Sequence, residues 1–139
     1  MNILWVDDDI RSAFLNPFAD EFKDEGYRII SASSPEEMWN VLAKSGSDVD
    51  VIIMDMMLPV GSSVPPSEAK LGIHTGIYLI KKLKEMKKYS NTPIICFSII
   101  GDQEVLDWAN REKIIFLKKQ ETFPDELVSK VKSLSRKVT

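Results

Sequence analysis

The stretch VIIMDMMLP, residues 51–59, places one carboxylate inside a run of apolar side chains. Four apolar residues lead into Asp55, and three more separate it from Pro59. A nearly continuous apolar run is typical of a strand that is covered on both faces, as in a parallel sheet. A buried carboxylate is costly unless it is paired, bound to a metal or neutralised. The stretch therefore predicts a buried strand that ends in a site where other groups compensate Asp55.

Four more short apolar runs are predicted to be strands, and segments of helical period follow each of the five strands. The strands are expected at 2–6, 27–32, 49–55, 92–98 and 113–118. The helices are expected at 11–25, 33–46, 76–89, 102–112 and 123–138, and Pro17 should kink the first helix or shift its start. A strand followed by a helix, repeated five times, predicts an α/β fold with a parallel five-stranded sheet and helices on both faces.

The composition indicates one soluble domain that spans residues 1–139, with 44% hydrophobic and 28% charged residues. The formal net charge of −3 gives no general attraction for nucleic acid or for an anionic membrane, and no stretch approaches the length of a membrane span. One cysteine, Cys96, cannot form an internal disulfide, which favours the cytoplasm. One histidine, His74, excludes any metal site that needs two imidazoles.

One segment, VGSSVPPSEAKLGIHT at residues 60–75, fits neither strand nor helix. It is longer than most connections between elements, and loops of this length usually have a function or are mobile. Because it follows the strand that ends at Asp55, we expect it beside the site, as a lid or a partner surface. We interpret His74, near its end, as a loop residue.

Ligands of a doubly wound sheet bind beyond the carboxyl ends of its strands. Two carboxylates about 4 Å apart repel each other by roughly 4 kcal/mol at an effective dielectric near 20, and a hard divalent cation such as Mg²⁺ removes that penalty. An aspartate can also accept a phosphoryl group as a nucleophile, while an ammonium and a hydroxyl stabilise the transferred group. The predicted strand ends carry these groups: Asp7, Asp8, Asp9, Asp55, Ser98, Lys118 and Lys119.

Four motifs, in this order and spacing, resemble the receiver domain of two-component response regulators: ILWVDDD, VIIMDMMLP, PIICFS and FLKK. The resemblance covers essentially the whole chain. It implies a flavodoxin-like (βα)5 three-layer sandwich with strand order 2-1-3-4-5.

The resemblance also implies a role for each site residue. Asp55 corresponds to the phosphorylated aspartate, Ser98 to the switch hydroxyl and Lys119 to the lysine of the site. Phe116 corresponds to the aromatic residue that changes rotamer on activation. The expected Mg²⁺ ligands are Asp7, Asp8, Asp55 and the backbone carbonyl of Met57.

Several positions leave alternatives or depart from the family pattern. Asp9 is interpreted as a charge at a helix N-terminus rather than as a metal ligand. Lys118 competes with Lys119 for the site, and the spacing from Phe116 favours Lys119. Gln120 stands where a proline usually follows the lysine, which predicts an altered loop or an unusual cis peptide bond. A bulky Ile99 follows Ser98 and is expected to narrow access to the site.

The resemblance implies a stand-alone phosphorylation switch and not an enzyme, beyond catalysis of its own phosphorylation and dephosphorylation. A sensor histidine kinase or a phosphotransfer protein would supply the phosphoryl group. An unknown downstream protein would bind the surface made by 102–112, 113–118 and 123–138, and the chain would be a monomer or a weak dimer through that surface. The alternative is a protein-interaction module with this fold that does not use phosphorylation. Gln120, Ile99 and the insertion at 60–75 favour it, whereas the intact set of site residues argues against it: Asp7, Asp8, Asp55 and Lys119. A phosphatase with an aspartate nucleophile is excluded because Met57 stands where such enzymes need a second carboxylate.

Overall fold

The protein, seen here as a computed structural model, is built on one parallel sheet with the strand order β2-β1-β3-β4-β5. The structure describes residues 1–44, 48–59, 61, 64–65, 74–99 and 101–138. The strands are β1 (Asn2–Val6), β2 (Arg28–Ala32), β3 (Val51–Met54), β4 (Ile94–Ser98) and β5 (Ile115–Lys118). The helices are α1 (Asn16–Asp24), α2 (Pro35–Lys44), α4 (Thr75–Glu85), α5 (Gln103–Arg111), the 3₁₀ turn η1 (Lys119–Glu121) and α6 (Pro124–Val138). The predicted fold class and strand order are confirmed.

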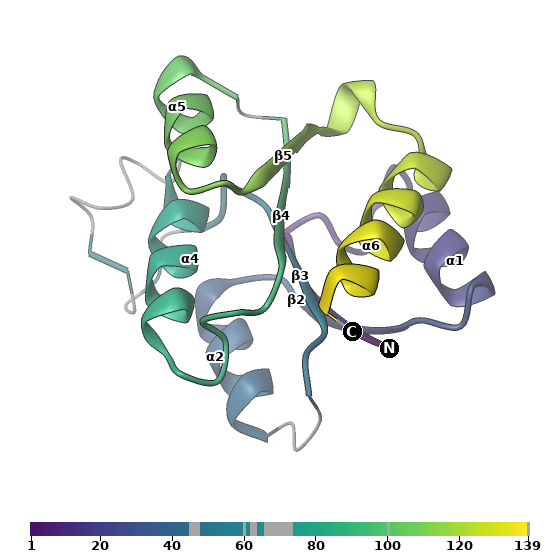
Figure 1. Ribbon diagram of the computed structural model, residues 1–139, viewed down its shortest axis with the longest axis horizontal. Coiled ribbons are helices and arrows are strands. Elements are labelled where there is room, and N and C mark those ends of the chain that lie inside the picture. Colours follow the sequence, from purple (N-terminus) through teal and green to yellow (C-terminus); the bar gives the residue numbers. More distant parts are fainter. Residues whose placement is uncertain (45–47, 60, 62–63, 66–73, 100, 139) are drawn as a thin grey trace.

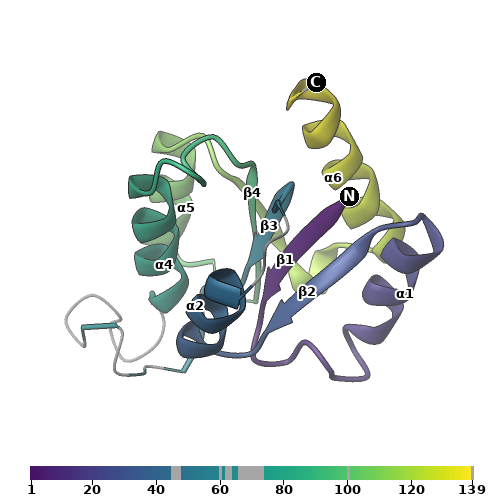
Figure 2. The same ribbon diagram turned by 90° about the horizontal axis from the view of Figure 1, so that it is seen from below.

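Helices cover both faces of the sheet and complete a three-layer sandwich. Figure 1 shows the sheet nearly edge-on, with α1 and α6 on one side and α2, α4 and α5 on the other. The view from below in Figure 2 shows the same separation of the two helical layers. All four residues of β3 and all five of β4 are buried, as their continuous apolar sequence predicted.

Two apolar clusters hold the layers together, one on each face of the sheet. Successive side chains of a strand point to opposite faces, and β1 follows this rule. Ile3 and Trp5 belong to the cluster that α1 and α6 cover, whereas Leu4 and Val6 belong to the cluster under α2, α4 and α5. Trp5 packs edge-on against Phe22 of α1. The central strands are therefore anchored from both sides, and this fixes where their carboxyl ends lie.

Helix boundaries differ from the predicted ones where local chemistry interrupts the period. The first helix was expected at 11–25, but α1 begins only at Asn16, with Pro17 in its first turn, where a missing amide hydrogen costs nothing. The residues between Asp7 and α1 form successive turns. The helix expected at 76–89 ends at Glu85, and turns follow it up to β4.

The predicted insertion at 60–75 lies largely outside the described residues, so its role as a lid or partner surface stays a prediction. Of its described residues, Val64 is buried in the same apolar cluster as Met38. Gly61 lies directly against the carboxylate of Glu36 on α2.

In the described part of the chain, no helix has the length and apolar character needed to cross a membrane.

Candidate functional site

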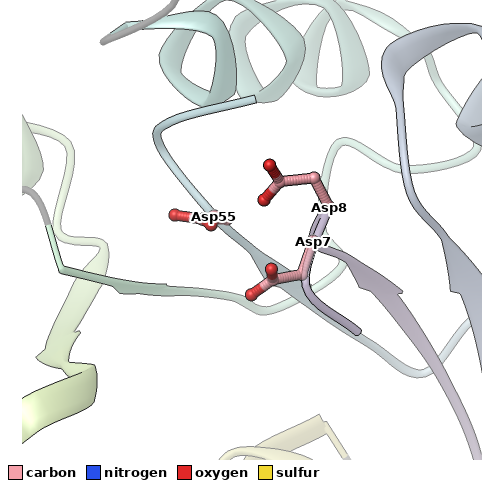
Figure 3. Close-up of side chains that lie close together, drawn as sticks. All are labelled: Asp7, Asp8 and Asp55. Carbon is pink, nitrogen blue, oxygen red and sulfur yellow. The ribbon is translucent and has the colours of Figure 1, made fainter. Parts of the chain in front are cut away.

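The carboxyl ends of β1, β3 and β4 meet at one edge of the sheet and bring the predicted site residues together. Asp7 and Asp8 follow β1 directly, and Asp55 follows β3. β1 pairs with β3 so that Val6 lies opposite Met54, and the amide of Asp55 donates to the carbonyl of Val6 at 2.9 Å. Figure 3 shows the carboxylates of Asp7, Asp8 and Asp55 converging.

These three carboxylates are close enough to share one cation. One oxygen from each of Asp7, Asp8 and Asp55 lies within 4.8 Å of the others. Asp7 and Asp55 are buried, whereas Asp8 is exposed and opens the cluster to solvent. The structure therefore brings together the three side chains that were predicted as metal ligands.

Lys119 is the buried cation of the site. Its Nζ lies 2.7 Å from Oδ2 of Asp7 and 3.1 Å from Oδ2 of Asp55, so that one ammonium bridges two carboxylates. Lys119 is 5% exposed, whereas Lys118 is less buried and forms no ion pair with any residue that the structure describes. The choice of Lys119 over Lys118 therefore matches the geometry. The peptide bond before Gln120 is trans, as are all those described, and the altered loop is the 3₁₀ turn η1.

Ser98 ends β4 and faces Asp55. Its hydroxyl donates to Oδ1 of Asp55 at 2.5 Å and accepts from the amide of Met56 at 3.4 Å. The amide of Met57 also donates to Oδ1 of Asp55 at 3.3 Å. Both carboxylate oxygens of Asp55 therefore accept hydrogen bonds from the protein, and these compensate its buried charge.

The crowding of carboxylates affects their proton affinity. Burial, and then repulsion from Asp55, raise the pKa of Asp7 from its ordinary 3.8 to about 6. The same two causes raise the pKa of Asp8. Burial alone would lower the pKa of Lys119, but Asp55 and Asp7 outweigh it, so that pKa is raised and the ammonium stays charged. The site carries more negative charge than its one lysine neutralises.

A pocket of about 180 Å³ opens above these groups. This is smaller than the roughly 300–1,000 Å³ of sites for drug-sized ligands, and it suits a phosphoryl group with a small hydrated ion. Ile99 is 63% exposed and Met57 45% exposed, and both lie at the pocket as apolar side chains. The lining residues are Asp8, Asp9, Asp55, Met57, Ser98, Ile99 and Lys119.

The interpretation of Asp9 as a helix N-terminal charge is wrong. α1 begins seven residues later, at Asn16, because Pro17 defines its first turn. Asp9 instead lies in the turns after β1, where its amide donates to Oδ1 of Asp7 at 2.8 Å. It is exposed and lines the pocket beside Asp8.

Phe116 lies on β5, half-buried against the cluster under α2, α4 and α5. Its ring lies beside Gly101, in the segment between Ser98 and α5. A Cβ added at Gly101 would be 3.3 Å from Cε1 of Phe116. Phe116, the predicted switch aromatic, thus packs beside the segment that follows Ser98, the predicted switch hydroxyl. The change of rotamer of Phe116 stays a prediction.

The sequence analysis missed three residues at the start of α4. His74 is buried, and its Nε2 lies 3.5 Å from Oδ2 of Asp102, the N-cap residue of α5. Thr75 and Gly76 make hydrogen bonds to the turn that follows Asp55. His74 was interpreted as a loop residue, and no pattern near it indicates burial. The only available signal was Gly76, a glycine at the start of a predicted helix.

Solved structures similar to this chain are response regulators. A putative response regulator from Chloroflexus aurantiacus is 25% identical, with a TM-score of 0.73 and 97% of each chain covered. The receiver domain of the Francisella response regulator 1452 is 24% identical, with a TM-score of 0.73, and the match covers 99% of this chain and 98% of that one. A response regulator from Desulfuromonas acetoxidans is 18% identical, with a TM-score of 0.75 and coverage of 99% and 98%.

Comparison with protein-family models gives no match, and comparison with the curated proteins gives none either. The chain has the fold of response regulator receiver domains over nearly its whole length, which confirms the predicted resemblance at the level of the fold.

Proposed function

We propose that the chain is a phosphoacceptor signalling switch in which Asp55 receives a phosphoryl group. The observation that carries this proposal is the arrangement around Asp55. Ser98 donates to one carboxylate oxygen and Lys119 donates to the other. One oxygen from each of Asp7, Asp8 and Asp55 lies close enough to the others to share one metal ion. The fold, shared with receiver domains, supports the same function by analogy.

The residues at this site fit Mg²⁺. Three carboxylates with a single lysine leave a surplus of negative charge. Oxygen ligands are what Mg²⁺ prefers, and the exposed Asp8 and the open pocket leave room for its water molecules. The expected ligands are Asp7, Asp8, Asp55 and the carbonyl of Met57. When bound, Mg²⁺ supplies positive charge that neutralises carboxylate and phosphoryl oxygens.

In the transfer step the phosphoryl group moves from a donor to the carboxylate of Asp55. One oxygen of Asp55 attacks the phosphorus of a phosphohistidine on the partner protein, the new O–P bond forms, and the N–P bond breaks. The imidazole leaves with the electron pair and takes up a proton from solvent. Lys119 neutralises part of the transferred charge, and the hydroxyl of Ser98 is placed to donate to a phosphoryl oxygen. Dephosphorylation is a separate hydrolysis: water attacks the phosphorus, the bond between Asp55 and phosphorus breaks, and inorganic phosphate leaves while the Asp55 carboxylate is regenerated.

The phosphorylated state is transmitted by protein–protein contact. A phosphoryl group adds about −1.5 to −2 charges and new acceptor oxygens, which attract the Ser98 hydroxyl. The segment after Ser98 leads past Gly101, where the ring of Phe116 packs, into α5. The surface formed by α5, β5 and α6 therefore responds, and it binds the downstream protein or a second copy of the chain.

The phosphoryl donor is a sensor histidine kinase or a phosphotransfer protein. Such donors act in the cytoplasm, in keeping with one buried, unpaired cysteine, Cys96. In this proposal the chain catalyses no reaction on other molecules.

Intact-mass measurement after incubation with a small acyl phosphate tests the proposal. We expect one added phosphoryl group that requires Mg²⁺ and is absent from the Asp55→Asn variant. Asn keeps the shape of the side chain but has no carboxylate nucleophile, so it is the matched control. A folded protein that binds Mg²⁺ but gains no mass from an active donor contradicts the proposal.

A second candidate is a protein-interaction module that does not use phosphorylation. The specific observation in its favour is the pair Met57 and Ile99, two exposed apolar side chains at the pocket over Asp55. They restrict the approach of a donor and form an apolar patch suited to a protein partner. Partner binding that is equal for the unsubstituted chain and for Asp55→Asn, before and after the donor is added, would favour this candidate.

A further inference from the structure

The carbonyl groups of the turn after Asp55 differ in their partners. The carbonyl of Met56 accepts from the amide of Gly76 at 2.9 Å. The carbonyl of Leu58 accepts from the hydroxyl of Thr75 at 3.1 Å. The carbonyl between them, that of Met57, accepts no hydrogen bond within the described residues. Met57 is also the one of these three turn residues that is exposed and lines the pocket beside Asp55.

Both donors come from the first two residues of α4, which are buried against the turn. Thr75 has no exposed surface, and its hydroxyl reaches a carbonyl 17 positions away in the chain. Gly76 packs so closely that an added Cβ would lie 2.1 Å from the carbonyl oxygen of Asp55 and 2.8 Å from Cα of Met56. Only glycine allows this approach, so the start of α4 is held at a defined distance from the turn.

We propose that Thr75 is a positioning residue for metal binding. Its hydroxyl ties the carbonyl of Leu58 to α4, while the neighbouring amide of Gly76 ties that of Met56. The backbone of Met57 is thereby held on both sides, and its carbonyl stays available to a cation beside Asp55. This inference rests on the proposed function, because it concerns the Mg²⁺ site of that function.

The physical basis is preorganisation. A ligand that is already held in place loses little conformational entropy on binding, and groups that orient metal ligands typically change metal affinity by about 10–100-fold. If the hydroxyl of Thr75 is removed, the Leu58 carbonyl loses its donor and the turn gains freedom. Metal binding must then also order the backbone of Met57, and the lost conformational entropy weakens the affinity. The hydroxyl of Thr75 donates to the carbonyl of Leu58, the residue after Met57, so the effect acts through the turn.

The variant Thr75→Val removes the hydroxyl and keeps the branched shape, and Thr75→Ser keeps the hydroxyl. We expect calorimetric titration of the full chain with MgCl₂ to give about tenfold weaker binding for Thr75→Val and binding within about twofold of the original for Thr75→Ser. Ser90→Ala is the matched control, because it also removes a hydroxyl that donates to a backbone carbonyl, that of Lys87. Ser90 precedes the start of β4, whereas the site lies at the end of that strand. Thermal unfolding without metal shows separately whether each variant is folded at the titration temperature.

Carbon-detected carbonyl NMR of the unsubstituted chain keeps the inference testable even if Thr75→Val does not fold. This method also reports the carbonyl of Leu58, which precedes Pro59 and has no following amide hydrogen. Saturating Mg²⁺ should move the carbonyl resonance of Met57 and leave that of Leu58 nearly unchanged.

Three results would overturn the inference. Mg²⁺ binding by Thr75→Val equal to that of the original chain excludes the positioning role alone. Movement of the Leu58 carbonyl instead of the Met57 carbonyl excludes it as well. No Mg²⁺ binding by the unsubstituted chain overturns the proposed metal site itself, and the positioning role with it.

Discussion

Ser98 donates its hydroxyl hydrogen to Oδ1 of Asp55 over 2.5 Å, although the two residues are 43 positions apart in the chain. The pairing of Met54 with Cys96 in neighbouring strands brings their ends together. The hydroxyl therefore contacts the carboxylate before any phosphoryl group is present. In the proposed function, a hydroxyl already in contact with Asp55 has only a short distance to move toward the added negative charge, and the backbone that follows Ser98 moves with it.

Replacement of Ser98 by Ala should separate phosphorylation from its transmission. Asp55 keeps Lys119 and is still phosphorylated, but the segment after β4 loses the group that follows the phosphoryl charge. We expect the amide NMR shifts that phosphorylation causes in α5 and β5 to fall to a small fraction of the original. Ser98→Thr retains a hydroxyl and should restore most of them. Equal shifts in Ser98→Ala and in the original chain would contradict the role of Ser98.

Replacement of Lys119 by Met should change metal binding and phosphorylation in opposite directions. The ammonium competes with Mg²⁺ for Asp7 and Asp55, so its loss should tighten Mg²⁺ binding several-fold at pH 8. The same change removes a charge that stabilises the transferred group, so phosphorylation should slow by about tenfold or more. Calorimetry and timed intact-mass measurements test both effects. Lys118→Met is the control, and weaker Mg²⁺ binding in Lys119→Met would refute the competition.

The raised pKa of Asp7 predicts how the stability of the metal-free protein depends on pH. The pKa of Asp7 is about 6 in the folded protein and near 3.8 when unfolded, so its contribution to stability is fully present below pH 3.8. It is lost as the pH rises through about 6. Urea unfolding in EDTA should show this loss in the original chain and a flatter profile between pH 4 and 7 in Asp7→Asn. Parallel profiles of the two proteins would exclude Asp7 as the cause.

Two glycine substitutions should differ in cost for different physical reasons. Gly76→Ala places a Cβ 2.1 Å from the carbonyl oxygen of Asp55, so the backbone must shift, and we expect a loss of about 3 kcal/mol or more in the free energy of unfolding. Gly26, after α1, has a φ of +86° and nothing within 4 Å of an added Cβ. Gly26→Ala should therefore cost only about 1 kcal/mol, from backbone strain. Equal costs in denaturant unfolding would contradict the close approach at Gly76.

Ile99→Ala should widen the entrance to Asp55 without changing stability. Ile99 is 63% exposed, so little buried surface is lost, and the melting temperature should stay within about 1–2 °C. We expect the rate of phosphorylation by a small acyl phosphate to rise several-fold, as followed by intact mass. Phe123→Ala removes another exposed apolar side chain that does not line the pocket, and it should leave the rate unchanged. An unchanged rate in Ile99→Ala would show that the side chain does not restrict access.

The site residues that follow strands were predictable because a parallel sheet brings its strand ends together. Asp7, Asp55 and Ser98 each end an apolar run, and the structure brings all three together. Lys119 needed one more argument, the spacing from Phe116, because Lys118 is chemically equivalent. Asp9 was misassigned because the start of α1 depends on Pro17 and not on the apolar period that suggested a helix from residue 11.

The sequence by itself determined the order of the elements, the burial of β3 and β4, and the carboxylates that meet at the ends of β1 and β3. These follow from local pattern, since period and chain order are readable without distances. Only the tertiary structure decided that Lys119 bridges two carboxylates and that Thr75 and Gly76 hold the turn after Asp55. Those contacts join residues far apart in the chain through single hydrogen bonds and close packing. Their formation depends on how α4 and η1 pack against the sheet, which no local pattern encodes.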